Sequence, residues 1–475
     1  MAFRRIALST AAMSSVSILR LLAQLFVVPI LSRLLSPADY GVVAMAMPLV
    51  LFTMIFTDVG VGQSLVRTSQ TEEGVWSTSF WLTMCSGSLL ALGIAALGPA
   101  AALFYHEPRL TPIVVALALV IIPQAGATIP EASLRQSKRF GTIAATEISA
   151  VLCGVALAVT VALEGGGAWA LVAQQLTLYG MRFVLTFWFS SFRPRFHFHL
   201  KSISDHLLFG RNVLTANFMW FLTASIDGMI VGRVLGATAL GLYSMAFQFA
   251  RLPVLLISGP LQYVIYTHLA PLRDDKDTLR RIFLLFTRVL GIIIFPAVGM
   301  VAAAHHAVFK IFLSEKWLES GTLFMLAAPA ASVQAVTAMR GTLTMVLGRT
   351  EIQLRCSIEF FFVLGALLLT FIWFGMNWFV VGYNLAVFLY LPRALMLILP
   401  LVDCPMPDYF RVMAVPAGVT AGCILVYWLL LQAAAMGDWT QLFLGGGISV
   451  AGIALSALIQ RRALTDAAAL LRENW

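Results

Sequence analysis

Arginine residues lie within long apolar segments of this sequence, where a charge is costly. A charge at the centre of an apolar membrane helix costs about 2.5–3.5 kcal/mol, so it usually faces a cavity or a partner. The planar guanidinium binds anionic oxygens in bidentate fashion, which suits an arginine in a cavity to hold a phosphate or diphosphate group. The arginines in these segments are Arg20, Arg182, Arg211, Arg251, Arg288, Arg340 and Arg393.

Two of these arginines lie near the middle of their segments, where a side chain cannot easily reach the membrane surface. Arg20 shares a helix face with Gln24, and Arg251 shares a face with Gln248. A polar stripe on an otherwise apolar helix is expected to point inward. We therefore predict that Arg20, Gln24, Gln248 and Arg251 bind substrate.

Two further stripes are centred on Arg182 and Arg340, which we also predict to bind substrate. For each arginine the alternative remains a structural salt bridge or an anchor at the membrane surface. The neighbours in these stripes are Gln175 and Tyr179 beside Arg182, and Gln334, Thr337 and Thr344 beside Arg340.

Acidic residues in the same segments could form a gate or hold a coupling ion. Glu131, Glu147 and Glu359 lie toward the same membrane side as the arginines. They could close an ionic gate there, although the usual bias of basic residues toward the cytoplasm explains the same pattern. Asp227 lies toward the opposite side, where it could pair with Arg233 or bind a coupling cation.

The elements that carry these residues are transmembrane helices. The sequence is 60% hydrophobic and only 11% charged, and a bilayer-spanning helix needs about 20 apolar residues. Strands with open edges would leave backbone groups unpaired in lipid. We therefore predict an all-α polytopic membrane protein with about fourteen spans. The expected spans are 9–32, 42–63, 79–103, 111–134, 141–163, 168–190, 207–232, 239–266, 282–304, 319–347, 352–374, 377–400, 409–431 and 441–460.

The placement of charge explains the formal net charge of +9 without invoking nucleic acid. If both termini are cytoplasmic, most of the Lys and Arg residues outside the spans fall in inside loops, as the positive-inside rule requires. The five Cys residues show no CxxC spacing, so we expect neither a metal site nor a cofactor.

A repeated turn indicates two homologous halves. LSRLLSPADYGVVAMA at 31–46 and VGRVLGATALGLYSMA at 231–246 share five identities without a gap. Six helices and a linker account for the separation, so we predict two pseudo-twofold-related six-helix lobes, the architecture of alternating-access carriers. The predicted parts are an N-terminal lobe at 1–190, a basic cytoplasmic linker at 191–206, a C-terminal lobe at 207–400, and two additional helices with a tail at 401–475.

Three segments, SRLLSPADYG at 32–41, TDVGVGQSLVR at 57–67 and STSFWL at 77–82, resemble the N-terminal pattern of bacterial polysaccharide exporters. These are lipid-linked oligosaccharide flippases, including the colanic acid exporter branch, of the multidrug/oligosaccharidyl-lipid/polysaccharide superfamily. The resemblance implies movement of an undecaprenyl-diphosphate-linked glycan from the cytoplasmic to the periplasmic leaflet. It also implies substrate arginines on spans one and eight, which Arg20 and Arg251 match.

Two other functions fit the sequence less well. A cation-coupled multidrug antiporter of the same superfamily would need buried acids, whereas span one carries Arg20 and no acid. A membrane-embedded polysaccharide polymerase or glycosyltransferase would present reactive residues in large outer loops, whereas most loops expected outside are short. We therefore expect a transporter rather than an enzyme, with lipid-linked glycan, membrane lipid and other export proteins as partners.

Overall fold

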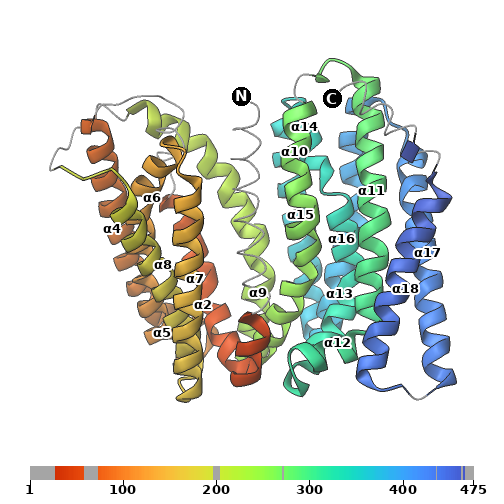
Figure 1. Ribbon diagram of the computed structural model, residues 1–475, viewed down its shortest axis with the longest axis horizontal. Helices are drawn as coiled ribbons and strands as arrows, with labels where there is room; N and C mark the ends of the chain where they lie inside the picture. The colour runs from red at the N-terminus through yellow and green to blue at the C-terminus, as the bar shows by residue number, and fades with distance from the viewer. Residues whose placement is uncertain are drawn as a thin grey trace. The chain divides into compact units, whose positions relative to one another are not determined.

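A computed structural model describes residues 27–57, 73–195, 204–269, 272–434, 436–461 and 464–465. In these ranges every regular element is helical, as Figure 1 shows. The helices up to α9 are α2 (Pro37–Thr57), α4 (Glu73–Tyr105), α5 (Leu110–Ala118), α6 (Ile121–Gln136), α7 (Phe140–Leu163), α8 (Ala168–Phe189) and α9 (Ser204–Pro253). Those that follow are α10 (Gly259–Leu269), α11 (Lys276–Ala303), α12 (His305–Phe312), α13 (Leu318–Val336), α14 (Met339–Val346), α15 (Thr350–Phe371), α16 (Met376–Ile398), α17 (Met406–Ala433) and α18 (Asp438–Ile459).

These helices make the chain a polytopic membrane protein, which confirms the predicted fold class. Ten helical segments in the described ranges are long and apolar enough to cross a bilayer, and a bent pair at Val27–Leu34 and Pro37–Thr53 adds an eleventh. The predicted first span lies mostly outside the described residues. The predicted seventh and eighth spans share the long helix α9, which is broken at Gly236, where φ is 83°.

The chain divides into two compact units, Met1–Gly241 and Leu242–Trp475. In the first unit α7 packs along α8, and α6 packs against both α4 and α8. In the second unit α11 packs against α13, and α15 packs against α16. The two last helices, α17 and α18, pack on α11 and on each other. The division falls inside α9, whereas the predicted linker is at 191–206, so the exact lobe boundaries stay a prediction.

The repeated turn interrupts a helix in both places. The first turn breaks the helix before Pro37, and its axis bends by 120°; the second breaks α9 at Gly236. Ser36 and Asp39 cap the start of α2, since the Asp39 amide donates to Ser36 Oγ (3.3 Å) and Ser36 Oγ donates to Asp39 Oδ2 (2.6 Å). Each turn therefore ends one helical segment and begins the next.

The two turns also pack against each other within the first unit. A Cβ atom on Gly41 would lie 1.7 Å from the carbonyl oxygen of Ala237, and one on Gly241 would lie 1.8 Å from that of Pro37. Real Cβ atoms do not approach a backbone oxygen so closely. Glycine at both positions is therefore what allows the two helix starts to cross in direct backbone contact.

Candidate functional site: an arginine cavity in the second unit

Arg340 is held at the start of a short helix by a break in its span. The span divides between Val336 and Met339, at the end of α13 and the start of α14. Arg340 Nε donates to the carbonyl oxygen of Thr337 (3.0 Å), and Nη2 donates to Thr337 Oγ1 (3.0 Å). Thr337 therefore fixes the orientation of the guanidinium with both its backbone and its side chain.

The guanidinium lines a cavity of about 230 Å³ that lies among α13, α14, α15 and α16. Apolar side chains such as Phe360, Val387 and Leu391 form much of its wall. The polar residues that line it beside Arg340 are Gln334, Thr337, Thr344, Gln353, Ser357 and Tyr390. The cavity thus combines an apolar wall with one cation and several neutral hydrogen-bonding groups, which is the usual make-up of a ligand site.

No carboxylate in the described part of the chain forms an ion pair with Arg340, whose bonding partner is Thr337. A guanidinium carries five N–H donors, so roughly three remain after the two bonds to Thr337. An unpaired charge away from bulk water is unfavourable, and an anionic ligand would remove that cost. The free N–H groups could hold two oxygens of a phosphate group in bidentate fashion.

Glu359, on the neighbouring helix α15, is engaged by other residues. It accepts from Arg355 Nε (2.8 Å), from Arg393 Nε (3.3 Å) and from the Tyr390 hydroxyl (3.3 Å). Two arginines therefore neutralise this carboxylate, and Tyr390 connects the cluster to the cavity wall. The positive charge of Arg340 is left for a ligand.

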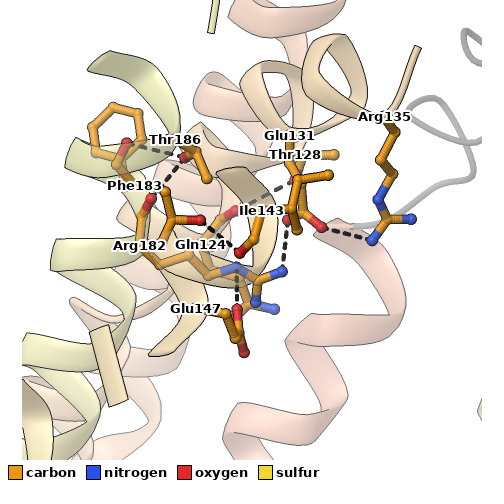
Figure 2. Close-up of polar contacts among 10 residues, drawn as sticks. Gln124, Thr128, Glu131, Arg135, Ile143, Glu147, Arg182, Phe183 and Thr186 are labelled. Carbon is orange, nitrogen blue, oxygen red and sulfur yellow. Dashed lines mark hydrogen bonds and ion pairs between the residues drawn. The ribbon is translucent and has the colours of Figure 1, made fainter. Parts of the chain in front are cut away.

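The first unit shows the opposite arrangement, because its buried arginine is neutralised. Arg182 Nη2 on α8 lies 2.6 Å from Glu131 Oε2 on α6, and Arg182 Nε lies 3.4 Å from Glu147 Oε2 on α7. Glu131 also accepts from Arg135 (2.6 Å) one turn along α6. Figure 2 shows the Arg182 guanidinium between the two carboxylates. This network ties three helices of the first unit together.

Comparison with known proteins shows the family. A model of the family described as "Polysaccharide biosynthesis protein" matches residues 30–322, which is more than half of the chain. The chain belongs to this family. It is thus a multi-pass membrane protein of a polysaccharide biosynthesis family, in agreement with the resemblance of its N-terminal segments.

The names of this chain's curated relatives refer to the biosynthesis or transport of polysaccharides. The teichuronic acid biosynthesis protein TuaB of Bacillus subtilis is 28% identical over 323 residues, which cover 67% of this chain and 65% of TuaB. The lipopolysaccharide biosynthesis protein WzxC of Escherichia coli is 24% identical over 69% of this chain and 67% of its own. The succinoglycan biosynthesis transport protein ExoT of Rhizobium meliloti is 26% identical over 61% of this chain. The chain spans about two thirds of the length of the first two relatives.

Solved structures show which fold the exporter has. The lipid II flippase MurJ in an inward closed conformation matches with a TM-score of 0.74 over 96% of this chain and 99% of MurJ, at 12% identity. An inward-facing multidrug resistance transporter of the MATE family matches with a TM-score of 0.57 over 81% of this chain, at 13% identity. Both likenesses concern the fold alone.

Of the remaining residues predicted to bind substrate, only those on α9 lie within the described part of the chain. Arg20 and Gln24 lie outside the described residues. Arg251 lies in the last turn of α9 with an exposed side chain, and Gln248 is half-buried one turn earlier. Their assignment as substrate ligands stays a prediction.

Asp227 is buried on α9 and accepts from the Gly228 amide (2.8 Å). Arg233, one partner considered for it, instead donates to His106 Nδ1 (2.7 Å) and lies over the Phe104 ring. Glu131, Glu147 and Glu359 pair with arginines of their own unit. A role for Asp227, Glu147 or Glu359 in coupling or gating stays a prediction.

Three cavity residues were not singled out from the sequence: Gln353, Ser357 and Tyr390. Gln353 and Ser357 are four residues apart on α15, so they share a helix face. That spacing alone predicts that both polar side chains face the interior of the unit. Tyr390 carries no comparable signal, because a single tyrosine in an apolar span is as readily a surface or packing residue.

Proposed function

We propose that this exporter moves an undecaprenyl-diphosphate-linked oligosaccharide from the cytoplasmic to the periplasmic leaflet of the bacterial inner membrane by alternating access. Arginines in its cavities would hold the diphosphate, and both termini would be cytoplasmic. The polysaccharide names of the relatives and the fold likeness to a lipid II flippase support the proposal. Other polysaccharide synthesis and export proteins would be its partners.

The observation that carries the proposal is the arginine cavity of the second unit. Arg340 presents a positive charge to a cavity of about 230 Å³, and no described carboxylate neutralises it. A diphosphate would supply the missing negative charge, and the neutral amides and hydroxyls around Arg340 would complete its hydrogen bonds. Arg20, Gln24, Gln248 and Arg251 would contact the same substrate, whereas Arg182 would need to leave its two glutamates first.

A multidrug antiporter is disfavoured by the same cavity, because an unpaired arginine repels cationic drugs. A polymerase or glycosyltransferase would need a reacting constellation, and the polar groups around Arg340 offer hydrogen bonds rather than a nucleophile with a general base.

The test uses proteoliposomes that contain the purified protein and a fluorescent undecaprenyl-diphosphate oligosaccharide. Movement of the label between leaflets is followed for the wild type and for Arg20→Ala and Arg251→Ala. Movement by the wild type and its loss in both variants supports the proposal. If the wild type moves no lipid-linked glycan but exports a cationic drug along a cation gradient, the exporter is an antiporter and the proposal is wrong.

A further inference from the structure

The first unit contains a second cavity, which differs in chemistry from the arginine cavity. Its volume is about 320 Å³, and residues of α2, α5, α7 and α8 contribute to its wall. The apolar lining residues are Val27, Met47, Val50, Leu51, Leu117, Val120, Val151 and Leu178. The polar lining residues are Gln174, Gln175 and Tyr179, all on α8.

These three polar side chains are available to a ligand. Each is half-buried, and none has a side-chain hydrogen bond to another described residue. Gln175 and Tyr179 are one helical turn apart, so they face the cavity from the same side of α8. Their polar atoms are not fully buried, so a ligand in the cavity can replace water as their hydrogen-bond partner.

The described lining of the cavity offers little to an anion. Among the residues that the structure describes, no charged one lines it, and the nearest arginine along α8, Arg182, is held by Glu131 and Glu147 at 2.6 and 3.4 Å. The phosphate groups of a substrate would find no uncompensated positive charge among these lining residues. A neutral, hydroxyl-rich ligand fits better, since each amide can both donate and accept hydrogen bonds.

We propose that this cavity is a glycan subsite, in which Gln174, Gln175 and Tyr179 bind a neutral hexose of the substrate. The two amides bond to sugar hydroxyls, and the Tyr179 ring packs against the apolar face of the pyranose. An acyl chain in the same place would leave both amides without partners. The proposal rests on the proposed function, and it assigns glycan recognition to this cavity of the first unit.

The test measures equilibrium binding to the full-length protein in lipid nanodiscs with two probes. One probe is undecaprenyl diphosphate that carries a short chain of neutral hexoses, here called the hexosyl probe, and the other is undecaprenyl diphosphate without sugar. Gln175→Leu and Gln174→Leu remove one amide each. Leu178→Met is the matched control, because it changes the same cavity wall without changing its polarity.

We expect the wild type to bind the hexosyl probe more tightly than the bare lipid. Each Gln→Leu variant should weaken hexosyl binding about fivefold, the worth of one net hydrogen bond of about 1 kcal/mol, and leave bare-lipid binding unchanged. Leu178→Met should bind both probes as the wild type does.

Either of two results would overturn the subsite while leaving the proposed function in place. One is equal binding of the two probes by the wild type; the other is an equal change in both probes, or none, in the Gln→Leu variants. Binding of neither probe by the wild type would instead overturn the proposed function, and the subsite with it.

Discussion

Gly41 and Gly241 occupy equivalent places in two turns that pack against each other, although they lie half a chain apart in sequence. Gly41 lies against the backbone of Ala237, and Gly241 lies against the backbone of Pro37. The exchange is reciprocal, as in a twofold contact between two copies of one motif. The repeated turn is thus a structural joint of the first unit. Glycine is required at both positions because no side chain would fit there.

Alanine at either glycine should destabilise the protein severely. Overpacking a tight contact costs typically about 1–3 kcal/mol, and here the added methyl would meet backbone atoms, which cannot rotate away. We expect Gly41→Ala and Gly241→Ala to lower both the melting temperature in detergent and the amount of protein in the membrane.

Gly93→Ala is the matched control for the joint, because a Cβ on Gly93 would meet nothing within 4 Å. In a helix it should be neutral or slightly stabilising. A Gly41→Ala protein as stable as Gly93→Ala would contradict the close packing of the two turns.

In the first unit, replacing Glu131 should lower the stability of the protein more than replacing the exposed Arg135 beside it. Glu131→Gln removes the carboxylate that holds Arg182 and Arg135, and removal of one partner of a buried ion pair costs about 3–5 kcal/mol. Arg135→Gln should cost much less, because the Arg135 side chain is 45% exposed. Melting temperatures of the purified variants compare the two.

A double-mutant cycle measures the interaction energy between Glu131 and Arg182. Glu131→Gln combined with Arg182→Gln should cost less than the sum of the two single changes, because neither member of this pair is then left charged opposite a neutral partner. Strictly additive losses would show that Glu131 and Arg182 do not stabilise each other.

The surface pair Glu107–Arg109, between α4 and α5, should make a small contribution to stability that depends on pH. The side chain of Arg109 donates to Glu107 Oε1 (2.8 Å), and this hydrogen bond holds the pKa of Glu107 below its ordinary value of 4.5. A lowered folded-state pKa means that the stabilisation is present above the ordinary value and is lost as the pH falls through the folded pKa.

The measurement is the melting temperature of the wild type and of Glu107→Gln between about pH 3 and pH 7. Because the Arg109 side chain is 56% exposed, the difference near neutral pH should be below about 1 kcal/mol. It should vanish at the acid end. A difference that grows as the pH falls would contradict the assigned pKa shift.

Much of the fold was predictable from the sequence, because the bilayer leaves few alternatives to long apolar helices. The repeated turn was recognised from five shared residues, yet its reciprocal packing was not, because a contact between Gly41 and Ala237 leaves no periodic signal. The site was predicted in part. The stripe around Arg340 follows from helical spacing, whereas the pairing of Arg182 with Glu131 joins residues on different helices and could not be read from either one.

The central claim, that Arg340 holds the diphosphate of a lipid-linked glycan, is tested most directly by leaflet-to-leaflet transport in proteoliposomes. Arg340→Gln should reduce the apparent affinity for undecaprenyl-diphosphate oligosaccharide about tenfold or more, the worth of a hydrogen bond to a charged group at about 1.5–3 kcal/mol. The control, Arg349→Gln, removes the same charge from a side chain that is 61% exposed and should transport as the wild type does. Unchanged transport by a correctly inserted Arg340→Gln protein would contradict the claim.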